Sequence, residues 1–147
     1  METGNSEQDN GINYLDIFSH RTNEGDDGMS FKDALHYLKH NDAIIKSGNR
    51  RIVNRYAKIS SIIALKQAIV ANGPCIGGLP VYNSNVTDFW NKHRGSFEGG
   101  HAIAIVGYNK EGFIIRNSWG KNYGQNGYSL LPYEDFDKFY ELWTIIE

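Results

Sequence analysis

The sequence predicts an α+β fold in which short helices precede an antiparallel sheet. Two helical patterns, at residues 31–40 and 62–72, come before several short β-branched runs that are bounded by glycines. Helices first and antiparallel strands later are typical of α+β domains, and closely spaced strands predict a small barrel or a curled sheet. A chain of 147 residues is long enough for one domain with a buried core.

The two helices have clear start and stop signals. Ser30 precedes residues 31–40, where apolar side chains recur at i, i+3, i+4 and i+7, as on one buried face of a helix. Ser60 or Ser61 is expected to cap residues 62–72, and a Gly-Pro pair ends that segment. Between them, the basic residues of the 41–59 segment favour a solvated connection over a binding patch.

The remaining elements complete the expected organisation. A short helix is expected at residues 12–20 and a helical turn at 134–140. Strands are expected at residues 75–82, 101–108, 112–120, 127–133 and 142–146. The chain therefore divides into three parts, a flexible arm at residues 1–11, a helical part at 12–40 and a barrel domain at 41–147.

Composition and charge exclude several classes of protein. With 40% hydrophobic and 22% charged residues the chain is expected to fold, and a net charge of −2 argues against nucleic acid or an anionic membrane as the main partner. No apolar run approaches the ~20 residues of a membrane span, and the polar start predicts no secretory signal on this chain. A single cysteine, Cys75, favours a reducing, intracellular setting without disulfides.

Two neighbouring segments carry residues suited to catalysis, GGHAIAIVGY at 99–108 and IIRNSWGKNYGQNGY at 114–128. If the two strands pair through the turn at 109–112, His101 and Asn117 lie side by side at one end of the hairpin. The asparagine oxygen can then fix the imidazole tautomer and leave the other ring nitrogen free as a base. Trp119 would exclude water from that hydrogen bond, which gives the base and orienter half of a nucleophilic triad.

A structural interpretation of the same residues remains open at this point. A histidine on an apolar strand is often a satisfied core residue, and an asparagine at a strand end is often a turn residue. The spacing alone is compatible with either interpretation.

These motifs resemble the C-terminal half of the papain-like cysteine peptidases. The family's pattern is a histidine opening an apolar strand into VGY, followed by NSWG and NGY, as in 101–108 and 117–128 here. The segments at 62–82 and, more weakly, 28–42 are also similar to the family, and 130–145 is similar to the endings of its microbial and viral branches. The resemblance covers about residues 28–147 and implies a truncated papain-like fold.

The resemblance implies a role for each site residue. His101 aligns with the catalytic base, Asn117 with its orienter and Trp119 with the shielding indole. The family's nucleophile is a cysteine at the start of a long helix, and in this numbering its position would fall before Met1. Cys75 follows Gly-Pro in an expected strand, with nothing beside it to lower its pKa, so no nucleophile is expected within the chain.

No metal or cofactor is expected either. His36 and His40 are spaced i, i+4, but the sequence offers no obvious third ligand for zinc beside them.

Four functions are compatible with these residues, in decreasing order of expectation. The first is a papain-like homologue that is inactive alone and acts as a structural or protein-interaction subunit, with another protein chain covering the face near His101, Trp119 and Tyr123. The second is one half of a split or processed peptidase whose nucleophile comes from another chain. The third is a small-molecule binder, and the fourth a peptidase with an unrecognised nucleophile. The expected setting is intracellular or within a viral particle.

Overall fold

The structure is a computed structural model, and its residues fall into two compact units. It describes residues 14–22, 28–41, 43–44, 50–51 and 53–146, so the expected arm at 1–11 lies outside the described residues. One unit comprises residues 1–56 and 145–147, and the other residues 57–144. Within the described ranges, no helix is both long and apolar enough to span a bilayer.

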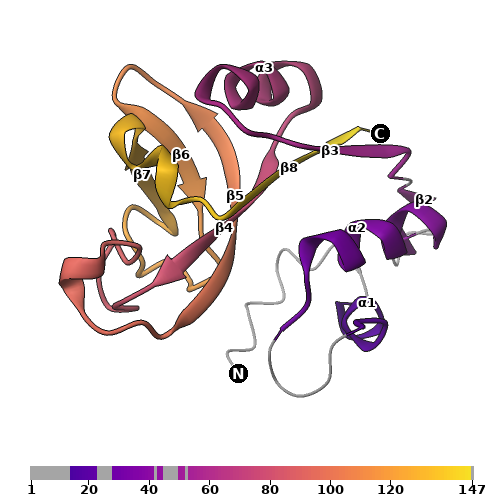
Figure 1. Cartoon of the computed structure of the whole chain (residues 1–147), viewed down its shortest axis with the longest axis horizontal. Helices are drawn as coiled ribbons and strands as arrows, with labels where there is room; N and C mark the ends of the chain where they lie inside the picture. The colour runs from indigo at the N-terminus through magenta and orange to yellow at the C-terminus, as the bar shows by residue number, and fades with distance from the viewer. Residues whose placement is uncertain (1–13, 23–27, 42, 45–49, 52, 147) are drawn as a thin grey trace. The chain divides into compact units, whose positions relative to one another are not determined.

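The first unit holds two helices and a small strand pair (Figure 1). Its elements are α1 (Tyr14–Ser19), α2 (Phe31–His40), β1 (Ala43–Ile44) and β2 (Arg50–Arg51). The Ser30 side chain accepts a hydrogen bond from the Asp33 N–H at 3.1 Å, which is the predicted N-cap of α2. The 41–59 segment, expected to be a solvated connection, contains the antiparallel pair β1–β2.

Helix α3 (Ile62–Asn72) belongs to the second unit and begins and ends as predicted. The Ser61 hydroxyl accepts a hydrogen bond from the Ala64 N–H at 3.1 Å, and Gly73 ends the helix with φ of 88°, a backbone angle that glycine adopts without strain. The helix packs against β4 and β5 and buries Leu65 completely.

Six strands form one sheet, in the order β3-β8-β4-β5-β6-β7. The strands are β3 (Arg55–Lys58), β4 (Cys75–Val81), β5 (Gly99–Tyr108), β6 (Gly112–Arg116), β7 (Tyr128–Pro132) and β8 (Glu141–Ile146). The register shows antiparallel pairing of β8 with β4, and then of each neighbouring pair from β4 to β7. Strands β3 and β7 stand at opposite ends of this order, so the expected barrel is a curled sheet that does not close.

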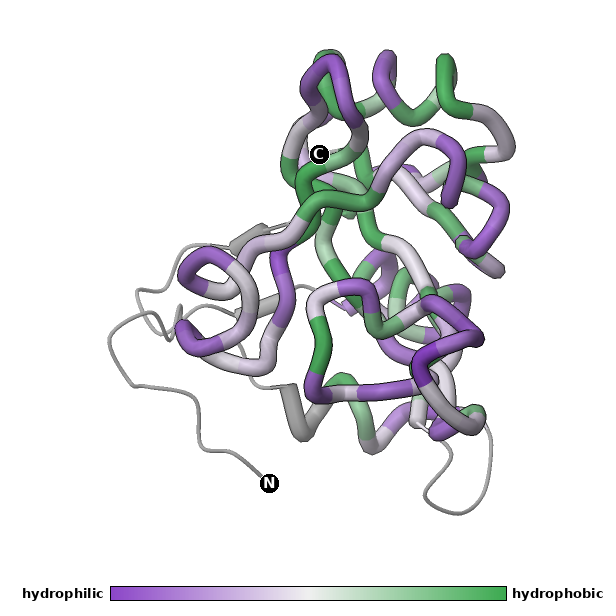
Figure 2. Tube along the Cα trace, turned by 90° about the vertical axis from the view of Figure 1, so that its left-hand side faces the viewer, coloured by the Kyte–Doolittle hydropathy of each residue, from purple (hydrophilic) through white to green (hydrophobic). Residues whose placement is uncertain are grey.

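One face of the sheet carries the core of the second unit. Figure 2 shows hydrophobic and hydrophilic stretches following one another along the chain trace. The fully buried side chains of this core include Leu79, Ile105, Phe113, Ile115 and Leu131. Two 3-10 turns, η2 (Lys92–Arg94) and η3 (Tyr133–Lys138), lie in the connections.

The β5–β6 hairpin contains a one-residue irregularity. Ile105 pairs with Ile115, but Gly107 pairs with Ile114, so β5 carries one extra residue, Val106, as a β-bulge. The turn is closed by Asn109, whose side-chain oxygen accepts hydrogen bonds from the backbone N–H groups of Glu111 and Gly112. The sequence predicts the hairpin but not the bulge.

Candidate active site

His101 lies on β5 and faces the core side of the sheet. It pairs with Leu79 of β4, and strand alternation places its side chain on the same face as Ile103 and Ile105. Because those neighbours are buried, the imidazole stands half-buried at the end of an apolar row.

Asn117 lies directly after β6 and contacts His101 as the hairpin predicts. The distance from His101 Nε2 to Asn117 Oδ1 is 2.8 Å. His101 and Asn117 are nevertheless not directly opposite each other in the strand register. Extending the Ile105–Ile115 pairing would set residue 119 opposite His101, so Asn117 is its diagonal neighbour.

The backbone N–H of Ser118 determines which nitrogen of His101 carries the proton. The Ser118 N–H donates to Asn117 Oδ1 at 2.7 Å, so this oxygen is an acceptor. Because His101 Nε2 contacts the same oxygen, we assign the proton of the neutral ring to Nε2. In the neutral imidazole, Nδ1 therefore holds the lone pair. Among the described residues no hydrogen bond to Nδ1 is present, so this nitrogen is available as a proton acceptor.

Burial keeps the imidazole neutral. Removal from water lowers the pKa of His101 below its ordinary value, and the hydrogen bond to Asn117, which favours the protonated ring, offsets part of that effect. Asn117 is itself 7% exposed. A neutral imidazole with an unpaired Nδ1 can take a proton from a thiol or hydroxyl placed within about 3 Å.

Aromatic rings enclose the His101–Asn117 pair. Trp119 stacks on His101, with ring centroids 4.5 Å apart and planes 23° from parallel. Phe89 is fully buried and contacts both rings, with its centroid 4.8 Å from that of Trp119 and 5.7 Å from that of His101. Water is thereby excluded from one side of the hydrogen bond.

Tyr123 supports this cluster through Trp119. Its ring meets Trp119 edge-on at 5.6 Å, and its hydroxyl donates to the Thr87 carbonyl and is 2.7 Å from the Ser129 hydroxyl. The side chain is only 8% exposed. His101, Trp119 and Tyr123 were expected on a face covered by a partner, but Tyr123 is already buried within the unit. Its hydroxyl can be buried because it has polar partners there.

Cys75 lies in the core, away from His101. It is fully buried on β4 opposite Ile105, four residues along the strand from Leu79, a separation of about 13 Å at 3.3 Å per residue. Burial raises the pKa of the Cys75 thiol, which disfavours the reactive thiolate.

The two α2 histidines lie elsewhere, on the other unit. The rings of His36 and His40 are 4.3 Å apart, and His40 Nδ1 is 2.8 Å from the His36 carbonyl oxygen. Throughout the part of the chain that the structure describes, no group of three His, Cys, Asp or Glu side chains could hold a metal ion.

Phe89 belongs to the site although the motifs did not indicate it. It lies in the long connection between β4 and β5 and reaches His101 only through the folded chain. The adjacent aromatic pair Phe89-Trp90 in a polar connection was the available signal, because two neighbouring aromatics in such a segment tend to be buried. The Trp90 indole anchors this connection by donating to Asp135 Oδ2 at 2.9 Å.

Comparison with known proteins gives the same fold and the same family. The profile described as "Papain family cysteine protease" matches residues 21–135. Xylellain, a cysteine protease from Xylella fastidiosa, is structurally similar with a TM-score of 0.72 over 88% of this chain and 67% of its own, at 23% identity.

Viral relatives are also found. "Probable cysteine proteinase 224L" of Invertebrate iridescent virus 6 is 27% identical over 80% of this chain and 35% of its own length. "Uncharacterized peptidase C1-like protein L477" of Acanthamoeba polyphaga mimivirus is 34% identical over 56% of this chain and 31% of its own. The chain thus spans about a third of the length of these relatives. With a family profile that covers most of its residues, the chain belongs to the papain family of cysteine proteases.

Proposed function

We propose that these 147 residues do not cleave peptides by themselves and act as a protein-interaction subunit of an assembly. The single observation that carries this proposal is the position of Cys75, the only cysteine in the sequence. Cys75 is buried on β4, about 13 Å along the strand from Leu79, which pairs with His101. A base and its orienter have little catalytic value without a nucleophile, because triad members act as a unit.

The partner in this proposal covers the face that holds His101 and Trp119, with Tyr123 buried beneath it. The rings of His101 and Trp119 are themselves only partly buried, so they leave surface on that face. Burying a large apolar side chain contributes about 1.5–3 kcal/mol, so a partner would gain from covering this surface. A specific contact would bury at least ~1,000 Å² in total.

A second function is supported by the tautomer of His101. The donors around Asn117 Oδ1 leave Nδ1 as the unpaired nitrogen, which is the arrangement that a general base needs. In this alternative, a cysteine from a polypeptide segment outside these 147 residues lies beside Nδ1. Its thiol would pass its proton to Nδ1, and the thiolate would attack a peptide carbonyl.

Hydrolysis of a fluorogenic peptide by the purified chain tests the first function. We expect no hydrolysis above the background of the His101→Ala variant, and no labelling by active-site thiol reagents. Hydrolysis that is lost in His101→Ala would contradict the proposal, and if it is also lost in Cys75→Ser, the nucleophile is Cys75. Restored hydrolysis on adding a cysteine-bearing partner would instead support the second function.

Sedimentation of the purified chain tests the partner. The proposal predicts self-association or co-sedimentation with a second polypeptide, reduced by Trp119→Ser. A stable monomer that sediments alone, both as the purified chain and in the presence of the second polypeptide, contradicts the proposal that the chain acts in an assembly.

A further inference from the structure

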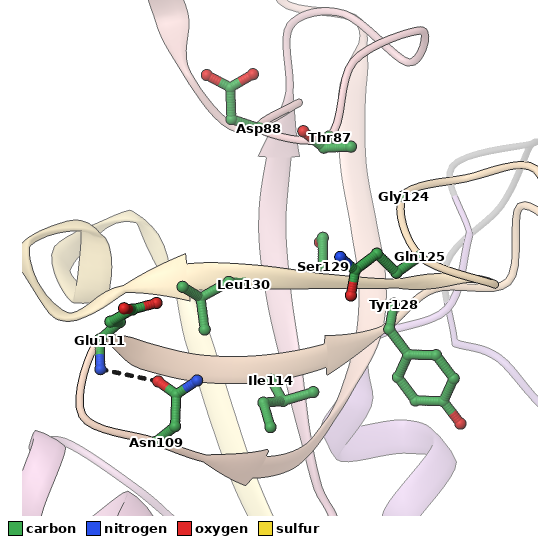
Figure 3. Close-up of a pocket in the computed structure, with 10 residues that line it drawn as sticks. All are labelled: Thr87, Asp88, Asn109, Glu111, Ile114, Gly124, Gln125, Tyr128, Ser129 and Leu130. Carbon is green, nitrogen blue, oxygen red and sulfur yellow. Dashed lines mark hydrogen bonds between the residues drawn. The ribbon is translucent and has the colours of Figure 1, made fainter.

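A groove of about 530 Å³ runs beside β7 and is used by neither proposed function. Figure 3 shows its lining, which comes from the connection before Phe89, the β5–β6 turn, strands β6 and β7, and the connection between those two strands. His101, Asn117 and Trp119 do not line it. The groove is therefore a separate site, and the inference drawn from it does not rest on the proposed function.

The groove lies along an edge of the sheet where backbone groups are available. Strand β7 ends the strand order, and on its outer edge Tyr128 forms a bridge with Gln125. The Asn117 N–H donates to the Gly127 carbonyl at 2.9 Å, and hydrogen-bonded pairs alternate along an antiparallel ladder. Ser129 therefore pairs through hydrogen bonds with Ile115, and the N–H and C=O of Leu130 point away from β6.

The walls of the groove combine apolar and acidic side chains. Ile114 and Leu130 are cross-strand neighbours and are only partly buried. The charged side chains of the lining are Asp88 and Glu111, both acidic. Asp88 is held by Arg94, at 2.9 Å between Nη2 and Oδ2, whereas within the described residues Glu111 has no ion-pair partner and is exposed.

We propose that this groove binds an extended peptide segment of another protein by strand addition to β7. The Leu130 backbone supplies the hydrogen bonds, Ile114 and Leu130 contact the segment's apolar side chains, and Glu111 pairs with a lysine or arginine. Edge strands are templates for such pairing, in which main-chain bonds give affinity and side-chain contacts give selectivity. The acidic lining selects a basic segment over an acidic one.

Two groove residues connect this site to the His101 cluster. The Thr87 carbonyl and the Ser129 hydroxyl are both hydrogen-bonded to the Tyr123 hydroxyl, and the Tyr123 ring contacts Trp119. A segment seated in the groove would therefore contact residues that are hydrogen-bonded to Tyr123.

The test is fluorescence anisotropy of the full chain with two labelled hexapeptides, one of alternating valine and lysine and one of alternating valine and glutamate. The lysine peptide should bind saturably and the glutamate peptide should not. Glu111→Gln should weaken binding of the lysine peptide about two- to fivefold, the size of an exposed ion-pair effect, while the exposed Glu98→Gln, outside the groove, leaves it unchanged.

Two further variants test the strand addition. Leu130→Pro removes the edge N–H and should weaken binding about tenfold, since proline is tolerated on an edge strand but cannot donate. Thr87→Trp fills the groove from an exposed loop position and should abolish binding even if the proline variant does not fold. Equal binding of both peptides, no binding of either, or binding that Thr87→Trp leaves intact overturns the proposal.

Discussion

The imidazole of His101 and the indole of Trp119 are stacked, with ring centroids 4.5 Å apart and planes 23° from parallel. This contact covers one face of the histidine whose Nε2 bonds to Asn117 Oδ1 at 2.8 Å. The stack and the hydrogen bond together fix the orientation of the ring, and the hydrogen bond fixes the tautomer of its neutral form. Changes to either neighbour should therefore alter the titration of His101.

Replacing Trp119 with alanine should raise the pKa of His101 toward the ordinary value of about 6.5. Burial is the main cause of the lowered pKa, and Trp119 supplies part of that burial. Titration of the His101 ring protons by NMR measures the effect. The matched control is Tyr108→Ala, which removes an exposed ring that contacts Phe113 and leaves His101 untouched. An unchanged His101 pKa in Trp119→Ala would show that the stack does not control hydration of the ring.

Replacing Asn117 with aspartate should raise the pKa of His101, because a carboxylate at this distance favours the imidazolium. Asn117→Leu removes the acceptor for both His101 and the Ser118 N–H, and should destabilise the fold by about 1–3 kcal/mol. NMR titration and urea unfolding measure the two effects. A His101 pKa that is the same in Asn117→Asp and in the wild type would mean that the hydrogen bond is not formed in solution.

The lowered pKa of His101 makes stability depend on pH. Between the folded and unfolded pKa values the unfolded chain binds more protons, so the free energy of unfolding falls as the pH falls from about 6.5 through the folded value. The contribution is complete above about pH 6.5. Urea unfolding at about pH 7.5 and about pH 5 should show the loss, and His101→Gln should reduce it. Carboxylates act near about pH 4, outside this window. Equal pH slopes in both proteins would contradict the assignment.

Two adjacent glycines of β4 should differ in their tolerance of alanine. A Cβ on Gly77 would stand 2.8–2.9 Å from Phe139, Ile105 and Leu142, in the core, and Gly77→Ala should cost about 1–3 kcal/mol by overpacking. A Cβ on Gly78 would meet the ring of Tyr140 at 2.4–2.7 Å, and that ring is half-exposed and can move. Thermal unfolding of both variants tests the order. Equal destabilisation would indicate that Tyr140 is fixed in place.

The helix ends and the hairpin could be predicted from sequence because their signals are local. Ser30, Ser61 and Gly73 act on their own helices, and the β5 and β6 runs with an intervening turn specify a hairpin. The contact of His101 with Asn117 followed from that hairpin alone.

Other features depend on residues far apart in sequence. The β-bulge at Val106 shifts the register by one residue, and no local signal marks it. Phe89 reaches His101 from the connection between β4 and β5, and the hydroxyl of Tyr123 finds partners at Thr87 and Ser129. Such contacts are selected by packing of the whole unit, so neither propensity nor periodicity reveals them. The open sheet was not distinguished from a barrel because closure depends on strand tilt and stagger.

The tautomer of His101 can be read directly from long-range ¹H–¹⁵N NMR spectra of the imidazole at neutral pH. The donors around Asn117 Oδ1 predict a neutral ring with the proton on Nε2 and an unprotonated Nδ1. The Asn117→Leu variant serves as the reference, in which the preference for Nε2–H should weaken. A wild-type ring protonated on Nδ1, or on both nitrogens at neutral pH, would contradict the placement of a ready base at this site.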